Sequence, residues 1–142
     1  MRLLQYNIRY AVGGGAGMHM PLPGAGYVLG NQTVLPDVTK FIKSTDPDIV
    51  GLIEVDTGSI RSRKVNQAEK IAADLSMNTS YETKYGEKSI NQILPIVRKQ
   101  GNAFLTSRRV HGERFHYFDT GIKRLIIELE LEHYAIFLVH LS

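Results

Sequence analysis

The sequence predicts one α/β domain, in which a strand–helix–strand–helix order is followed by mostly antiparallel strands. Three observations predict this fold class. Apolar residues alternate at the start of the chain, two amphipathic segments flank one strongly apolar run, and the end of the chain alternates apolar and charged residues. The length of 142 residues is normal for a single domain.

The first strand is expected at residues 2–10, where Leu4, Tyr6 and Ile8 share one face. Asn7 comes close to the C-terminal end of this strand, and the sites of open α/β sheets gather at such ends. Its amide could donate a hydrogen bond to a phosphate oxygen and accept one from water. A lone asparagine at a strand end more often caps a turn, so its role depends on its neighbours.

The segment 11–31 reads as a long loop rich in Gly and Pro, and loops of this length are usually functional or disordered. Its "GGGAG" follows a strand, as a phosphate-binding loop does. The dinucleotide fingerprint, however, needs glycine where Met18 stands, and the following "HMPLPGAG" cannot start a helix. A flexible surface or substrate-side loop is therefore the stronger interpretation, and a nucleotide cradle the weaker one.

Two amphipathic helices are expected on either side of a strand at 49–55. The first helix, 33–44, carries an apolar stripe and places Pro36 in its first turn, where proline is tolerated. The second helix, about 62–75, repeats apolar residues at helical spacing.

Further strands are expected at 79–85, 101–107, 111–119, 123–132 and 133–142. The run 123–132 alternates clearly between apolar and charged residues, and it pairs with 133–142 through a short turn.

An acidic residue, Glu54, stands near the end of the apolar run "PDIVGLIEVD". An unpaired buried carboxylate is very unfavourable, so such an acid is exposed, ion-paired or bound to a metal. Taken alone, exposure at the strand end is the simpler interpretation by a small margin. The alternative is a hard divalent cation, because Mg²⁺ binds through one or two carboxylates and retains several waters.

Basic side chains and one histidine offer further candidates. His140 lies in the last apolar run, where a lone histidine is more often a core residue than a catalyst. Arg61, Arg63 and Lys64 form a basic cluster that a solvated helix start would explain. Cations at a helix start oppose the helix dipole, which adds some weight to a phosphate-binding role.

The composition indicates a globular chain of a reducing compartment, and we expect a cytoplasmic protein. Hydrophobic residues make up 43% and charged residues 22%, and cysteine is absent. The net charge of +3 is compatible with an anionic partner without requiring one. No apolar run approaches the ~18 residues that a membrane span needs.

Five motifs in order, "LLQYNIR", "DPDIVGLIEVD", "GNAFLTSR", "KRLIIELEL" and "FLVHLS", resemble the first half of the endonuclease/exonuclease/phosphatase superfamily, the DNase I-like hydrolases. The resemblance covers nearly the whole chain. It implies a four-layer αββα sandwich with two packed sheets, mixed and antiparallel. Residues 1–142 would then be a single, incomplete domain, the N-terminal half of such a protein.

The resemblance also implies a reaction, the hydrolysis of a phosphodiester or phosphomonoester that depends on Mg²⁺ or Mn²⁺. It assigns Glu54 to the metal, Asn7 to a catalytic and substrate-binding position beside the metal, and His140 to the scissile phosphate. Arg61 and Arg63 are expected to bind the phosphoester substrate, with nucleic acid as one candidate.

Two departures from the family qualify this function. Ile53 stands where the family has glutamine, and the G-D-x-N and S-D-H motifs of the family's second half do not occur in this sequence. We therefore expect the chain to be inactive by itself, and its exposed sheet edges, such as 134–142, to favour self-association. An alternative from another functional class is a non-catalytic module that binds anions or nucleic acid on the same fold.

Overall fold

Two β-sheets and two helices build the part of the chain that can be described. The computed structural model describes residues 1–11, 34–60, 62–83, 99–119 and 125–140. The first sheet comprises β1 (Leu3–Asn7), β2 (Ile49–Asp56), β3 (Asn78–Thr83) and β4 (Gln100–Thr106). The second comprises β5 (Gly112–Tyr117), β6 (Leu125–Glu130) and β7 (Ala135–Val139), and the helices are α1 (Val34–Thr45) and α2 (Gln67–Leu75).

The first sheet is mixed, with the strand order β1-β2-β4-β3. β1 and β2 are parallel, while β4 runs antiparallel to both β2 and β3. Parallel neighbours need a crossover connection, and α1 lies within the one between β1 and β2. The second sheet is antiparallel throughout, in the order β5-β6-β7. The expected α/β class with two packed sheets is confirmed.

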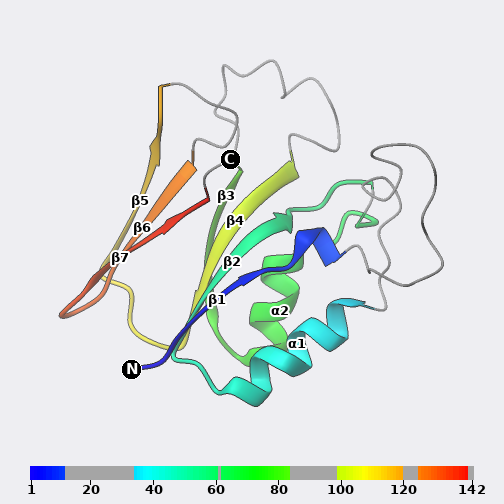
Figure 1. The fold of residues 1–142 in the computed structure, drawn as a ribbon, viewed down its shortest axis with the longest axis horizontal. Coiled ribbons are helices and arrows are strands. Elements are labelled where there is room, and N and C mark those ends of the chain that lie inside the picture. Colours follow the sequence, from blue (N-terminus) through cyan, green and yellow to red (C-terminus); the bar gives the residue numbers. More distant parts are fainter. Residues whose placement is uncertain (12–33, 61, 84–98, 120–124, 141–142) are drawn as a thin grey trace.

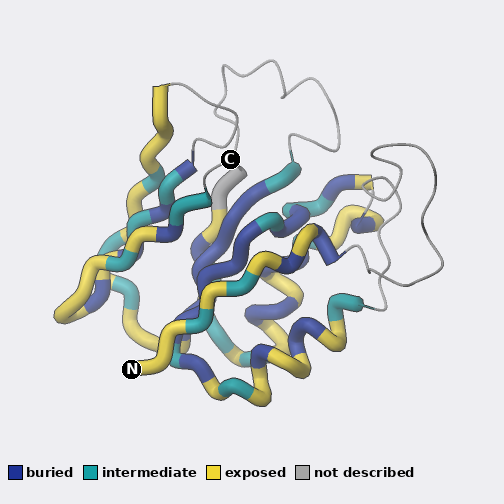
Figure 2. The backbone as a smooth tube through the Cα atoms, in the orientation of Figure 1, coloured by how far each residue is buried: buried dark blue, intermediate teal, exposed yellow. Residues whose placement is uncertain are grey.

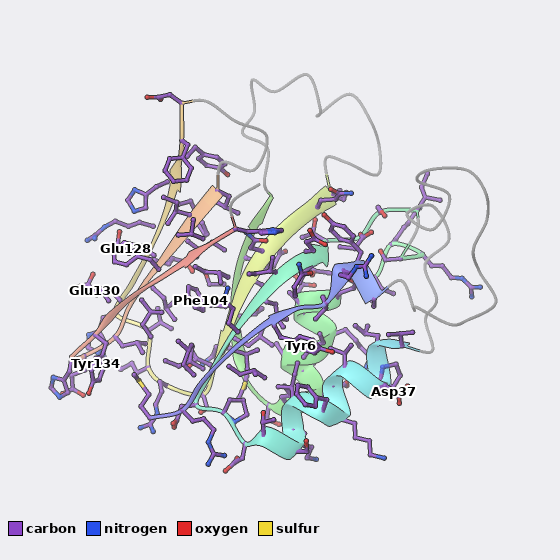
Figure 3. The ribbon with its side chains drawn as sticks, in the orientation of Figure 1. Tyr6, Asp37, Phe104, Glu128, Glu130 and Tyr134 are labelled. Atoms are coloured by element: carbon purple, nitrogen blue, oxygen red, sulfur yellow. The ribbon has the colours of Figure 1, made fainter. Side chains whose placement is uncertain are left out.

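The two helices cover one face of the first sheet, and the second sheet covers the other (Figure 1). On the helix side lies Tyr6 of β1 (Figure 3). Its ring meets that of Phe41 edge to face, at a centroid distance of 5.3 Å. The buried residues of this core are Ile8, Val38, Ile42, Val50, Leu52, Val55, Ala68, Ile71, Ala72, Ala103 and Leu105.

The second core lies between the sheets. Phe104 fills its centre from β4 (Figure 3). A Cβ atom built on Gly51 would lie 3.0 Å from Cδ1 of Leu138, so glycine at this position lets β7 approach β2 closely. Because helices cover one face and a sheet the other, β2 and β4 are buried along most of their length (Figure 2). The other members of this core are Ile49, Ile53, Leu125, Ile127, Leu129 and Leu131.

Two of the element boundaries that differ from the sequence-based expectation have a clear local cause. The first strand ends at Asn7, not at residue 10, because Arg9, Tyr10 and Ala11 adopt left-handed backbone conformations with φ of 46°, 59° and 50°. Such values are incompatible with a strand.

The second helix starts at Gln67 instead of about residue 62. The side chain of Asn66 accepts hydrogen bonds from two backbone N–H groups of the first turn, so it is the N-cap. Arg63 and Lys64 have positive φ values of 52° and 66° and lie before the helix. The expected conflict between these cations and the helix dipole therefore does not arise in its first turn.

The second sheet contains β7, the last strand in the described part of the chain. The turn between β6 and β7 is closed by a hydrogen bond of 2.8 Å from Leu131 N–H to the Tyr134 carbonyl, as the alternating pattern predicted. Within the described ranges no helix lies on the outer face of this sheet, so three layers are observed and the fourth stays a prediction. None of the described helices is long and apolar enough to cross a membrane.

Candidate functional site

The ends of three strands form one row on the first sheet. Asn7 of β1 pairs in register with Ile53 of β2, and Ile53 pairs with Asn102 of β4. Side chains of paired residues share a face, and Ile53 packs into the core between the sheets. The row therefore lies on the face that points toward the second sheet. Asn7 is exposed, whereas Asn102 is only 1% exposed.

Glu54 directly follows this row and interrupts the alternation of β2. Leu52 packs toward the helices and Ile53 toward the second sheet, so a regular strand would point Glu54 toward the helices. Val55 occupies the helix-facing core instead. One residue is therefore extra at this point of the strand.

The pairing of β2 with β4 identifies this extra residue as a β-bulge. Ile53 is paired with Asn102, and Val55 with Gly101, so that no residue of β4 is opposite Glu54. Glu54 has a φ of 58°, in the left-handed region. Its backbone N–H donates a hydrogen bond of 3.3 Å to the side-chain oxygen Oδ1 of Asn102. Bulges are known to redirect side chains next to active sites.

The Glu54 carboxylate meets a histidine from the other sheet. His140 directly follows β7, and its Nε2 lies 3.8 Å from Glu54 Oε1, an ion-pair distance when the imidazole is protonated. The side chain of Glu54 is 13% exposed and that of His140 is 16% exposed, and both residues make further interactions. The structure thus brings together two of the residues selected from the sequence. Asn7 lies beside them, paired with the residue before Glu54.

Asn7 also has a structural role. Its Oδ1 accepts a hydrogen bond of 3.0 Å from the backbone N–H of Arg9, which begins the left-handed turn after β1. The turn-capping interpretation is therefore confirmed. The NH₂ group of the same amide is a donor that this turn does not use, so capping and phosphate contact are compatible.

Sequence reasoning missed a buried acid, Asp56, at the end of β2. The Asp56 carboxylate accepts hydrogen bonds from the backbone N–H of Gly58 at 3.0 Å and of Ser59 at 2.6 Å. The hydroxyl groups of Ser59 and Ser62 donate to it at 2.5 and 3.0 Å. The letters "DTGS" carry the signal for such a turn, because Asp before Gly and Ser commonly bonds to the backbone two or three residues later.

A buried glutamine connects the end of β2 to the turn after β1. Gln67 Nε2 donates to the carbonyl of Tyr10 at 2.7 Å, and its Oε1 accepts from the backbone N–H of Asp56 at 2.9 Å. The Tyr10 hydroxyl donates to Gln100 of β4 at 3.0 Å. These bonds fix the segments that surround the ends of β1 and β2, and no sequence pattern identified them.

The arginines of the predicted site have different outcomes. Arg61 lies outside the described residues, as does most of the glycine-rich segment 11–31. Arg63 is exposed, and no hydrogen bond or ion pair joins it to the Glu54–His140 pair in the part of the chain that is described. Its role in substrate binding stays a prediction.

The donor set near Glu54 fits a hard cation only in part. In the described ranges, no three His, Cys, Asp or Glu side chains form a group that could hold a metal. A zinc site, which needs about three or four protein ligands, is therefore not formed by these residues. One carboxylate beside an exposed amide suits Mg²⁺ or Mn²⁺ better, because Mg²⁺ usually retains several waters.

A cavity with a volume of about 510 Å³ lies at the other end of the two sheets. Among its polar lining residues, Arg108 pairs with Asp48 through a 3.0 Å hydrogen bond from Nε. This hydrogen bond and that of Arg2 N–H lower the pKa of Asp48. The lining residues are Met1, Arg108, Arg109, His111, Leu131, Glu132, His133 and Tyr134.

Comparison with known proteins supports the fold. No protein-family model and no curated protein matches the chain. The human Nocturnin catalytic domain with bound sulfate anion superimposes with a TM-score of 0.63 and 16% identity, over 100% of this chain and 49% of that one. An endonuclease/exonuclease/phosphatase from Beutenbergia cavernae gives a TM-score of 0.60 and 18% identity, over 99% of this chain and 38% of that one.

A third structure, a functionally unknown conserved protein from Enterococcus faecalis, gives a TM-score of 0.58 and 11% identity, over 96% of this chain and 50% of that one. The chain thus spans half or less of the length of these structures. The resemblance indicated by the sequence motifs is confirmed at the level of the fold, which is DNase I-like.

Proposed function

We propose that this chain is the N-terminal part of a divalent-metal-dependent phosphoester hydrolase of the endonuclease/exonuclease/phosphatase type. A fold alone does not name a function, because one fold supports many activities. The observation that carries the proposal is the 3.8 Å approach of Glu54 and His140, which come from different sheets. Glu54 and His140 were selected from two different sequence motifs, and they meet at one end of the two packed sheets.

Each residue has a distinct role in the proposed site. Glu54 would hold Mg²⁺ or Mn²⁺, which neutralises charge on the oxygens of a phosphoester when it is bound. His140 would donate a hydrogen bond from Nε2 to a phosphate oxygen as negative charge develops there. The free donor side of the Asn7 amide would orient the phosphate without adding charge. Arg61 and Arg63 would bind a more distant part of the substrate.

We further propose that the chain is inactive alone, with the remaining metal ligands and the fourth layer of the sandwich supplied by a second half. Its partial coverage of the similar structures supports this. The sulfate bound by the Nocturnin catalytic domain is consistent with a phosphoester substrate, for which nucleic acid is a candidate. Without a second half, the exposed sheet edges would favour self-association.

Titration with Mn²⁺, followed by electron paramagnetic resonance of the free ion, tests the metal role of Glu54. Glu54→Gln should weaken binding on the order of tenfold or more, since it removes the charged ligand. Glu132→Gln is the matched control, because Glu132 is 74% exposed in the turn at the other end of the sheets. Equal affinities of the wild type and Glu54→Gln would contradict the proposal.

Assays with an aryl phosphodiester and Mn²⁺ test whether the chain is incomplete. We expect no turnover by the isolated chain. Robust turnover that Glu54→Ala abolishes would show that the chain is a complete enzyme and would overturn this part of the proposal.

The alternative function, a non-catalytic anion-binding module, is favoured by the arginines and histidines around the 510 Å³ cavity. It predicts metal-independent binding of single-stranded DNA that Arg109→Gln weakens and Glu54→Gln leaves unchanged. The hydrolase predicts that Glu54→Gln is the damaging substitution.

A further inference from the structure

We propose that Asn102 is a positioning residue, whose buried side-chain oxygen holds the backbone of Glu54 in the bulge that brings its carboxylate to His140. The proposed consequence for metal binding rests on the proposed function, because it takes Glu54 as the metal ligand. The consequence for the backbone of Glu54 does not depend on it.

The first argument concerns the register of β2 and β4 at the bulge. In an antiparallel pair, the extra residue of a bulge is not paired with the neighbouring strand. Glu54 is the extra residue, and no residue of β4 lies opposite it in the register. Asn102 Oδ1 accepts the Glu54 N–H at 3.3 Å, so a side chain of β4 contacts the backbone at the point where the register shifts.

The second argument concerns burial. Asn102 is 1% exposed, and its side chain lies on the face that carries Ile53 and Phe104 into the apolar core between the sheets. A buried amide is unfavourable in such surroundings unless it is hydrogen-bonded. An apolar residue would pack there without this cost, but it could not accept the Glu54 N–H. Asparagine at this position therefore points to a need for an acceptor.

The third argument concerns the conformation that the bond maintains. The left-handed φ of Glu54, 58°, is unfavourable for any residue with a Cβ atom, so the surroundings must enforce it. Without the Asn102 acceptor, the bulge loses a bond that opposes a return to ordinary strand geometry. Glu54 would then turn toward the helix-facing core or away from His140.

The experiment compares Asn102→Ala with a matched control on the same strand. Thr106→Val is suitable, because Thr106 is 2% exposed and its hydroxyl bonds to the Asp48 carbonyl at 2.9 Å, far from the bulge. Hydrogen exchange of the Glu54 amide is measured by ¹⁵N NMR. The affinity for Mn²⁺ is measured on the same samples.

Asn102→Ala should accelerate exchange of the Glu54 amide by roughly five- to tenfold relative to Thr106→Val. It should also weaken Mn²⁺ binding on the order of tenfold, as loss of a group that orients a metal ligand typically does. Asn102→Asp retains an acceptor at the same position and should restore slow exchange. If Asn102 merely filled the core, Asn102→Ala would affect the exchange of the Glu54 amide and the Mn²⁺ affinity no more than Thr106→Val does.

The two readouts separate this inference from the proposed function. Wild-type protein that fails to bind Mn²⁺ overturns the metal role of Glu54, while amide exchange still decides the role of Asn102. Unchanged exchange in Asn102→Ala overturns the inference. If that variant does not fold, Asn102→Asp decides: slow exchange at Glu54 supports the inference, and fast exchange overturns it.

Discussion

At the scale of the single residue, Glu54 carries backbone strain within a strand. A left-handed conformation costs an L-amino acid about 1–2 kcal/mol, yet Glu54 adopts it inside a strand, with φ of 58°. Strain of this kind persists where the surroundings impose it, and it concentrates at functional sites. The proposed metal ligand is therefore held in place at the expense of some stability of the fold.

Because of this strain, we expect glycine to give a more stable protein than alanine at position 54, which is the reverse of their order in a regular strand. Glu54→Gly should be more stable than Glu54→Ala by about 1 kcal/mol in free energy of unfolding, since only glycine accepts positive φ without steric cost. Glu128 on the regular strand β6 serves as the control position, where alanine should be the more stable of the two by about 0.5–1 kcal/mol. Urea denaturation measures all four variants, and greater stability of alanine at both positions would contradict a bulge at Glu54.

Some of the individual site residues could be predicted from the sequence, and others could not. Asn7, Glu54 and His140 could be selected because each stands in a short motif with a recognisable pattern. The bulge could not be predicted, because 49–53 is apolar on both faces and gives no alternation that a shift would disturb. Asn102 escaped for a related reason, since its partner is a backbone group that lies 48 residues away in the chain.

Among the elements, the carboxylate of Asp48 joins three strands. It links the starts of β1 and β2 to the residues that follow β4. Asp48 accepts a 2.6 Å hydrogen bond from the backbone N–H of Arg2 and a 3.0 Å bond from Nε of Arg108. The hydrogen bond from Arg108, followed by that from Arg2, lowers the pKa of Asp48 from its ordinary value of 3.8. The ionised form is thus favoured by folding.

This shift gives a pH dependence of stability whose sign is fixed. Because the folded pKa is the lower one, Asp48 stabilises the fold above pH 3.8, and this contribution is lost as the pH falls through the folded pKa. The difference in free energy of unfolding between the wild type and Asp48→Asn should therefore be greatest near neutral pH and shrink in acid. Urea titrations at several pH values measure it, and a difference that grows toward acid would contradict the assignment.

At the level of elements, periodicity located the strands and α1 to within a few residues. It failed where a side chain sets the boundary. The helical spacing before α2 includes Val65, but Asn66 caps the helix after it and leaves Val65 37% exposed. A capping bond is visible in a sequence only when it coincides with the periodic pattern.

For the molecule as a whole, the outer face of the second sheet carries an exposed aromatic side chain. Phe137 is 56% exposed on edge strand β7. Next to it, Glu128 binds Arg114 at 2.8 Å and His116 at 2.6 Å, and these partners, chiefly His116, hold the pKa of Glu128 below its usual value. An edge strand with an exposed aromatic residue is a template for association.

Self-association should therefore depend on this face. Sedimentation velocity is expected to show dimers or larger species at tens of micromolar protein, and Phe137→Lys should shift them toward monomer because a charge on an edge opposes pairing. Ile60→Lys is the control, as Ile60 is 73% exposed but belongs to neither sheet. A wild-type chain that sediments as a monomer throughout would contradict this prediction.

The architecture was predictable in part. The α/β class and the two sheets followed from the order of elements, and the motifs indicated the DNase I-like fold. The strand order β1-β2-β4-β3 could not be read from local patterns, because it is set by contacts between distant segments. The fourth layer and the completeness of the site stay predictions.

Because of the bulge, Glu54 could be removed without changing how the rest of β2 pairs with β4. On either side of Glu54, the pairs Ile53–Asn102 and Val55–Gly101 follow each other as in an unbroken ladder. Loss of the single codon for residue 54 would therefore leave every other side chain of β2 on its present face. In an evolving gene, one in-frame deletion could thus erase the proposed metal ligand while keeping the sheet, and one insertion could create it.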